Sequence, residues 1–271
     1  MPGMSEPSHL AADKLLVDRP ADAVVRLTIN NPAKRNALDH EILDAIAATI
    51  TGLDDARCVL ITGTEGMFSA GYDIGDIPSD VFAQEAERLV AHPFTAALEA
   101  LDAFPYPTVA ALNGHAIGGG LELALACDLR LAATAVQMGM PPAKLGLVYS
   151  HTGVDRFIDA IGVPRTSELF LVGRTIPAAE ALVWGLVNAV IDDHELPGTA
   201  LDWATEIAAH APLALSGNKR VIAEVAAAAR RLDPDVEQEL AALREACFAS
   251  EDFREGVRAF AEKRPPRWRG R

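Results

Sequence analysis

The order of apolar and polar residues along the chain predicts strands and helices in turn. Residues 25–29 alternate between apolar and polar side chains, which is the period of a half-buried strand. From residue 38 to residue 50 the apolar residues recur at helical spacing. Residues 58–63 form a continuous apolar run that ends at a glycine, which indicates a strand buried on both faces.

The alternation of strand, loop and helix continues to about residue 190. Residues 107–112 and 129–132 are predicted strands, and residues 121–126 are a predicted helix between them. Residues 81–103 are a predicted helix, which His92 and Pro93 interrupt. This alternation favours an α/β fold with parallel crossovers.

The two ends of the chain differ from this pattern. Residues 1–12 are small and polar, and we expect a disordered tail. Residues 13–198 then form the core, and residues 199–271 a helical region. In that region 199–231 and 234–262 are predicted helices, separated by Asp233 and Pro234.

Composition and charge exclude several classes of protein. The chain has 271 residues, half of them hydrophobic, and a net charge of -14. The negative charge argues against a general nucleic-acid binder, because phosphates require a surplus of Lys and Arg. The first residues lack a secretory signal, and no apolar run is long enough to cross a membrane. Three widely spaced cysteines suggest buried free thiols, so we expect a cytoplasmic protein.

Two glycine-containing loops are candidates for binding and catalysis. The first, residues 68–74, follows the predicted strand at 58–63; alone it would suggest a surface turn. The second, residues 113–120, contains three successive glycines directly before a helix. Such glycines let amides at a helix start approach an anion, either a phosphate or an oxyanion that develops during a reaction. The sequence matches neither a dinucleotide-binding fingerprint nor a P-loop, so an oxyanion hole is the better hypothesis.

Glu122 lies two residues after the last of these glycines. An acid in the first turn of a helix is often only a stabilising charge. Its neighbours Leu121, Leu123 and Leu125 are apolar, however, and burial would raise the pKa of a carboxyl group towards neutrality. Next to the glycines, Glu122 is therefore a candidate for proton transfer.

Both loops, in this order, resemble the signatures of the crotonase (enoyl-CoA hydratase/isomerase) superfamily. Residues 30–38 resemble its Asn-x-Pro-x-x-x-Asn-Ala-Leu turn, and residues 124–133 the segment after its catalytic helix. Residues 171–188 resemble a third, downstream motif. Together these similarities extend over most of residues 20–262.

The resemblance implies a spiral of ββα units followed by helices that form trimers, often paired into hexamers. It implies an acyl-CoA substrate, no cofactor apart from the coenzyme A of that substrate, and a thioester enolate intermediate. The amides of Ala70 and Gly119 would hold the thioester oxygen. The CoA contacts would come from Arg35, Ala37, Tyr72, Ile74, Phe260 and Lys263, the last two reaching a neighbouring subunit.

The chain departs from the hydratase pattern at two places. Hydratases use a second glutamate where this chain has Pro142, which transfers no proton. A glycine-rich turn is replaced by a segment with Tyr149 and His151, each of which could also be merely structural. The segment around Tyr149 resembles superfamily members that decarboxylate malonyl-type CoA thioesters, although Tyr72 stands where those enzymes can carry a histidine.

We therefore expect an enzyme of acyl-CoA metabolism with Glu122 as the proton-transfer residue and Tyr149 orienting the substrate. Decarboxylation or isomerisation is favoured over hydration. The alternative is a protein that binds acyl-CoA without catalysis, and dehalogenase, hydrolase and ring-forming reactions stay open. Residues 81–94 and 145–157 are expected to line the acyl pocket.

Overall fold

The computed structural model describes residues 7–73, 90–228, 234–267 and 269, and its centre is a seven-stranded sheet. Strands β3, β4, β6, β8 and β11 are parallel, and β1 and β2 add an antiparallel edge. In spatial order the strands are β1 (Ser8–Leu10), β2 (Leu15–Ala21), β3 (Val24–Ile29), β4 (Cys58–Gly63), β6 (Thr108–Leu112), β8 (Leu129–Ala133) and β11 (Ala189–Ile191).

A second sheet of four short strands lies next to the first and carries the site. Strands β5, β7 and β9 are parallel, and β10 closes one edge in the antiparallel direction. The chain repeatedly places one strand in the large sheet and the next in the small sheet, which confirms the predicted ββα arrangement. The strands are β10 (Thr175–Pro177), β9 (Gln137–Gly139), β7 (His115–Ile117) and β5 (Met67–Ser69).

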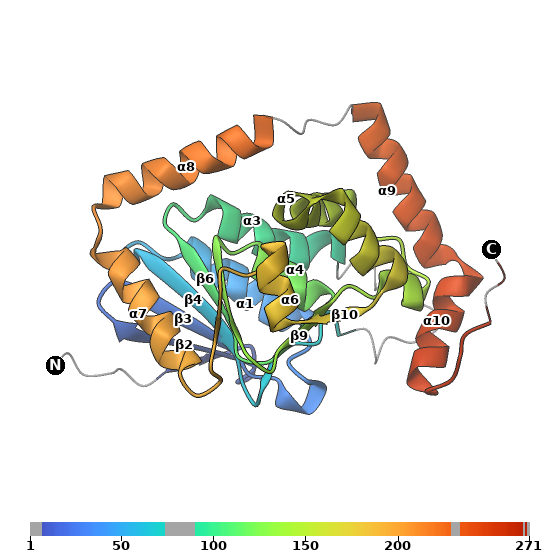
Figure 1. Cartoon of the computed structure of the whole chain (residues 1–271), viewed down its shortest axis with the longest axis horizontal. Coiled ribbons are helices and arrows are strands. Elements are labelled where there is room, and N and C mark those ends of the chain that lie inside the picture. The colour runs from blue at the N-terminus through green and yellow to red at the C-terminus, as the bar shows by residue number, and fades with distance from the viewer. Residues whose placement is uncertain (1–6, 74–89, 229–233, 268, 270–271) are drawn as a thin grey trace.

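Helices cover both sheets, and short helical turns connect them (Figure 1). The α-helices are α1 (His40–Thr51), α3 (Thr95–Ala103), α4 (Gly119–Leu125), α5 (His151–Ser167), α6 (Ala178–Trp184), α7 (Leu196–Ala209), α8 (Pro212–Ala228), α9 (Pro234–Ala249) and α10 (Glu251–Ala261). The turns are η1 (Pro32–Lys34), η2 (Val90–Phe94), η3 (Pro142–Leu145) and η4 (Glu168–Val172).

The core has the composition that the sequence pattern indicated. Strand β4 has the predicted bounds, and Val59, Leu60 and Ile61 are fully or almost fully buried. Burial of apolar area on both faces of the sheet is the main stabilising contribution to such a fold. Cys58 and Cys127 are buried free thiols, and burial raises the pKa of each to about 12, so neither is a reactive nucleophile.

The structure corrects several predicted boundaries. Ser8–Leu10 pair with β2, so part of the expected N-terminal tail is a strand. Asp39 precedes α1 and is its N-cap, because its side chain accepts the amide of Ile42 at 2.9 Å. Pro93 lies inside η2, a π-helical turn that leads directly into α3, so the structure shows a change of helix type there and not a break. Residues 81–89 lie outside the described residues.

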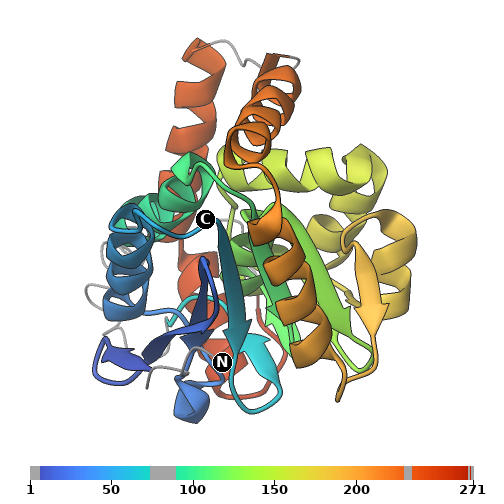
Figure 2. The same ribbon diagram turned by 90° about the vertical axis from the view of Figure 1, so that its left-hand side faces the viewer.

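The C-terminal region contains four helices where the sequence predicted two. Helix α7 packs along one face of the large sheet and therefore belongs to the core (Figure 2). Helix α8 extends away from that face, and Lys219 ties it to Asp128 with an ion pair of 2.8 Å. Among the described residues, no helix is long and apolar enough to span a membrane.

Candidate functional site

The two glycine loops predicted from the sequence meet in the structure. Strands β5 and β7 are parallel neighbours, so the chain segments after them leave the small sheet side by side. A Cβ atom at Gly71 would lie 2.8 Å from the carbonyl oxygen of Ile117 and 3.2 Å from the amide nitrogen of Gly119. Gly71 also has a φ of +92°, so both space and backbone conformation require glycine there.

Gly118 turns the chain from β7 into α4. Its φ of 56° and ψ of -127° belong to a region that is open only to glycine. Its carbonyl accepts the amides of Leu121 and Glu122, which fixes the first turn of α4. Within the described part of the chain the amide of Gly119 has no hydrogen-bond partner. Gly119 therefore presents the kind of donor that an oxyanion requires.

The prediction that Ala70 supplies the second donor is wrong for this structure. The amide of Ala70 donates to the carbonyl of Arg35 at 3.0 Å and is already used within the fold. The turn that accepts it is anchored by Asn36, a fully buried side chain that donates to the carbonyl of Met67 at 2.7 Å. Residues 30–38 thus position the first glycine loop.

Tyr72 follows Gly71 and forms a parallel bridge with Leu38. Leu38 donates to the carbonyl of Gly71 at 2.8 Å, and Asp73 donates to the carbonyl of Leu38 at 2.9 Å. Because peptide groups alternate in direction along a parallel ladder, the amide of Tyr72 points away from Leu38. The bridge therefore orients the backbone on both sides of Gly71.

Glu122 and Tyr149 form the polar centre of the site. Glu122 is only 2% exposed, and the hydroxyl of Tyr149 donates a short hydrogen bond to its Oε2. Burial, followed by the negative charge of Glu122, raises the pKa of Tyr149 well above its ordinary value. Tyr149 therefore keeps its proton and remains a neutral donor to the carboxylate.

Gly153, in the first turn of α5, makes this contact possible. A Cβ atom at that position would lie 2.6 Å from the ring of Tyr149 and 2.8 Å from Oε1 of Glu122. Ser150 caps the same turn by accepting the amide of Gly153 at 3.1 Å. Gly153 was not predicted as a site residue. The available signal was a glycine three residues after a serine that can cap a helix.

The side chain of Tyr72 reaches the same centre. Its hydroxyl lies 3.2 Å from that of Tyr149, and its ring lies against Gly119. The ring also makes an edge-on contact with Phe94, with 4.8 Å between centroids. The sequence predicted Tyr72 as a CoA contact only, since nothing in the sequence indicates that residues 72 and 149 touch.

Pro142 and His151 occupy positions close in sequence to Tyr149. Pro142 is buried and begins η3, where its carbonyl accepts the amide of Leu147 at 2.9 Å. It contributes no titratable group. His151 is the first residue of α5, directly after the cap Ser150. Both residues thus help to shape the chain segment that presents Tyr149.

The residues predicted to contact CoA are divided between two parts of the molecule. Arg35 is exposed and Ala37 is buried in the turn that precedes α1. Phe260, at the end of α10, is 72% exposed, and Lys263 follows in an exposed turn. Ile74 lies outside the described residues. These CoA contacts stay predictions.

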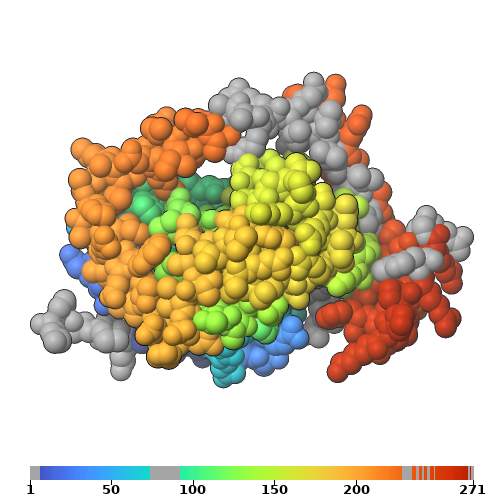
Figure 3. Space-filling view, viewed as in Figure 1, coloured from blue at the N-terminus to red at the C-terminus, as the bar shows by residue number. Residues whose placement is uncertain are grey.

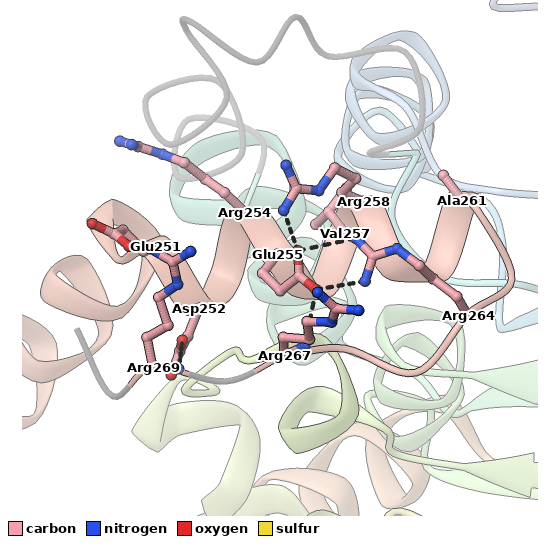
Figure 4. Close-up of a pocket in the computed structure, with 10 residues that line it drawn as sticks. All are labelled: Glu251, Asp252, Arg254, Glu255, Val257, Arg258, Ala261, Arg264, Arg267 and Arg269. Carbon is pink, nitrogen blue, oxygen red and sulfur yellow. Dashed lines mark hydrogen bonds and ion pairs between the residues drawn. The ribbon is translucent and has the colours of Figure 1, made fainter.

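A cavity of about 820 Å³ lies over α10 and the C-terminal residues (Figure 4), and Glu122 is not among the residues that line it. At its centre Glu255 binds the guanidinium groups of Arg258 and Arg264 and accepts the amide of Arg267 at 2.9 Å. These bonds lower the pKa of Glu255, the contact with Arg264 most strongly. The network holds the C-terminal segment against α10. No group of three or more metal-binding side chains occurs among the described residues.

The whole site lies within the part of the chain that resembles known proteins. A family model described as enoyl-CoA hydratase/isomerase matches residues 19–271. The chain belongs to this family. The crotonase fold and the resemblance stated from the sequence are therefore confirmed.

Relatives of this family include two bacterial proteins. The chain is 36% identical to the enoyl-CoA hydratase/isomerase-family protein YngF of Bacillus subtilis over 265 residues, covering 95% of this chain and 99% of YngF. It is 34% identical to the 2,3-dehydroadipyl-CoA hydratase of Escherichia coli over 262 residues, again 95% of this chain and 99% of the relative.

Solved structures include both hydratases and a decarboxylase. A methylmalonyl-CoA decarboxylase in complex with 2-nitronate-propionyl-CoA superposes with a TM-score of 0.86 at 27% identity, covering 95% of this chain and 99% of that one. An enoyl-CoA hydratase/isomerase from Pseudoalteromonas atlantica gives a TM-score of 0.79 at 30% identity, covering 94% and 100%.

Proposed function

We propose that this crotonase-family chain decarboxylates a malonyl-type CoA thioester through an oxyanion-stabilised enolate. The observation that carries the proposal is the hydrogen bond from Tyr149 to the buried carboxylate of Glu122. In this pair Glu122 is the acid–base group, and the hydroxyl of Tyr149 is its hydrogen-bond donor. Loss of CO₂ needs an oxyanion hole to stabilise the enolate, and a proton donor then protonates its α-carbon; neither step needs a second general base.

Hydration fits the site less well. Addition of water across a double bond requires one group to activate the water and another to protonate the α-carbon. In family members that hydrate, a second glutamate stands at the place of Pro142. Here the proline is buried, and Tyr149 occupies a hydrogen-bonding position of Glu122 that a water would need.

In the proposed step, the bond between the α-carbon and the substrate carboxylate breaks and CO₂ leaves. The electron pair passes to the thioester and forms an enolate, whose oxygen accepts the amide of Gly119. Because Ala70 is used elsewhere, we place the second donor at the amide of Tyr72, which faces away from Leu38. Such a donor typically contributes about 3 kcal/mol in the transition state.

For this step Glu122 is in its protonated form, and its proton completes the reaction at the α-carbon. Tyr149 no longer donates to Glu122 in that form, so its hydroxyl is able to orient the substrate carboxylate. Solvent restores the proton, so the overall change is one carboxylate and one proton converted to CO₂ and a carbon–hydrogen bond. The structural similarity to a methylmalonyl-CoA decarboxylase supports this assignment.

Isomerisation of an enoyl-CoA is the second candidate. A carboxylate that accepts a hydrogen bond, as Glu122 does, can remove a proton from one carbon and return it to another. The third possibility is binding of acyl-CoA without catalysis. Retention of Glu122, Tyr149 and both glycine loops favours a catalyst over a binding protein.

A mass-spectrometric screen of methylmalonyl-, 2-enoyl- and 3-enoyl-CoA distinguishes these functions. We expect loss of CO₂ from the methylmalonyl thioester and little hydration of the 2-enoyl thioester. Conversion of the 3-enoyl to the 2-enoyl thioester alone would favour the isomerase. Binding of the thioesters without turnover of any would favour the binding protein.

We also propose that the chain assembles as a trimer or a pair of trimers. Apolar side chains on α8 and on the η4–α6 segment are exposed, and both segments reach the same face of the molecule (Figure 3). Burying such a surface between subunits would remove it from water. The exposed residues include Leu213, Val221, Ile222 and Val225 on α8, and Leu171, Val172 and Val183 on the other segment. Phe260 and Lys263 would then contact CoA bound to a neighbouring subunit.

A further inference from the structure

The ring of Tyr72 is held in place from three sides. Its backbone is bridged to Leu38, and the ring meets Phe94 edge-on at 90°. On the third side it contacts Gly119, where a Cβ atom would lie 2.6 Å from the ring carbon Cε1. Packing on three sides fixes the rotamer of the ring and therefore the position of its hydroxyl. The fold thus determines the hydrogen bond that this hydroxyl makes.

Tyr149 is fixed as well. Its ring meets Phe170 at a centroid distance of 5.5 Å, and Phe170 in turn meets Phe157 at 5.0 Å. On the other side Gly153 leaves room for the ring. The contact of 3.2 Å between the hydroxyls of Tyr72 and Tyr149 therefore joins two immobilised side chains.

The number of protons gives this contact a direction. Each phenol has one proton, and that of Tyr149 is donated to Glu122. The hydrogen bond between the two hydroxyls then requires the proton of Tyr72. While Glu122 is ionised, the chain of donors consequently runs from Tyr72 to Tyr149 to Glu122.

We propose that Tyr72 is a positioning residue, whose hydroxyl holds that of Tyr149 and so fixes the donor that Glu122 receives. When Glu122 takes up a proton, the direction reverses: Glu122 donates to Tyr149, and Tyr149 donates to Tyr72. The hydroxyl of Tyr72 keeps its proton and can then donate a hydrogen bond towards the space beside Gly119, where the thioester would bind. Through this series of hydrogen bonds, the protonation state of Glu122 determines whether the hydroxyl of Tyr72 can donate a hydrogen bond to the substrate.

Other ionisable groups lie on the elements that pack against α4, and they belong to the electrostatic environment of this hydrogen-bonded series. The elements packed against α4 carry His151, Asp155 and Arg156 on α5, His115 on β7 and Arg130 on β8. Arg156 is paired with Asp102 of α3 and also interacts electrostatically with Glu122. The raised pKa of Tyr149 supports the proposal, since Tyr149 stays protonated while Glu122 titrates.

The protein is suited to a direct test because its sequence has only three tyrosines, Tyr72, Tyr106 and Tyr149. Tyrosine labelled with carbon-13 at Cζ gives one NMR signal for each. We expect the signals of Tyr72 and Tyr149 to move with a common midpoint as the pH is changed, and Glu122→Gln to abolish that step. Tyr72→Phe should shift the Tyr149 signal and change its midpoint, whereas Tyr106→Phe should leave both signals unchanged.

A kinetic test complements the NMR test and rests on the proposed function. Tyr72→Phe keeps the ring, so we expect KM for the thioester to change by less than about twofold while kcat falls about tenfold. The pH profile of kcat should shift, and Tyr106→Phe should retain the wild-type profile. A pH profile of Tyr72→Phe that superimposes on that of the wild-type protein would contradict the proposal.

The two tests separate two failures. If the tyrosine signals are coupled but no thioester is decarboxylated, the proposed function fails and the role of Tyr72 in the hydrogen-bonded chain stands. If decarboxylation occurs and the Tyr149 signal and midpoint are the same in Tyr72→Phe as in the wild-type protein, the role of Tyr72 is refuted and the function stands.

Discussion

Gly153 stands so close to Glu122 that a Cβ atom on it would lie 2.8 Å from Oε1 of the carboxylate. The same atom would lie 2.6 Å from the ring of Tyr149. Gly153→Ala therefore has to separate these two side chains. Overpacking of this kind typically lowers the free energy of unfolding by about 1–3 kcal/mol. We also expect kcat to fall at least tenfold, which corresponds to an increase of about 1.4 kcal/mol in the activation free energy.

Gly198→Ala is the matched control for this substitution. Gly198 lies in α7, and no atom is within 4 Å of the position its Cβ would take. In a helix this exchange should stabilise the protein by about 0.4–1 kcal/mol and leave kcat unchanged. Urea denaturation and steady-state kinetics of both variants give the comparison; equal kcat in Gly153→Ala and the wild-type protein would show that the contact is irrelevant to catalysis.

The contact between Gly119 and Tyr72 predicts coupling between two substitutions. Gly119→Ala alone should destabilise the protein by about 1–3 kcal/mol, because the new methyl group meets the Tyr72 ring. In a Tyr72→Ala background the ring is absent, so the same substitution should cost less. A double-mutant cycle measured by urea denaturation gives the coupling energy, and additive effects would contradict the contact.

Much of the fold follows from the sequence, and the reasons are local. Residues 58–63 form β4 with the predicted bounds because a short apolar run ended by glycine permits little else. The prediction of two long C-terminal helices was wrong, because Pro212 starts α8 after a break and Ser250 caps α10 by accepting the amide of Phe253. Such stops are easily missed within an Ala-rich helical pattern.

The site was less predictable, because it depends on contacts between distant residues. Glu122 and Tyr149 were proposed separately, and their hydrogen bond joins residues 27 positions apart. The choice of Ala70 was wrong because its amide is used by a turn more than thirty residues earlier in the chain. Which of several adjacent amides faces a ligand depends on that tertiary pairing, and composition does not reveal it.

The network around Glu255 predicts how stability depends on pH. The folded-state pKa of Glu255 lies below its ordinary value of 4.5, so its contribution is complete above that value and is lost as the pH falls through the folded-state pKa. The difference in unfolding free energy between the wild-type protein and Glu255→Gln should be constant from pH 8 to about pH 5.5, and narrow at lower pH. Glu206→Gln, at an exposed position of α7, is the control. A difference that widened towards acid would contradict the ion-pair network.

The exposed apolar residues predict the effect of a charge on assembly. Ile222 on α8 is 69% exposed in the single chain, and a subunit contact would bury it. Ile222→Asp should therefore reduce the mass in solution from a multiple of 28.8 kDa towards that of one chain. Light scattering after size-exclusion chromatography measures this mass, with Glu206→Lys as a charge-changing control. A wild-type protein that is monomeric at all concentrations would refute the proposed assembly.

The most direct test of the proposed function measures two reactions in one mixture. Methylmalonyl-CoA and crotonyl-CoA are incubated together with the protein in water enriched in oxygen-18, so that any hydration product carries the label. We predict that propionyl-CoA forms and labelled 3-hydroxybutyryl-CoA stays at the background level, and that Glu122→Gln lowers the decarboxylation rate by about 10²–10⁴-fold. Rapid formation of the labelled hydration product, abolished by Glu122→Gln and without loss of CO₂ from methylmalonyl-CoA, would contradict the account.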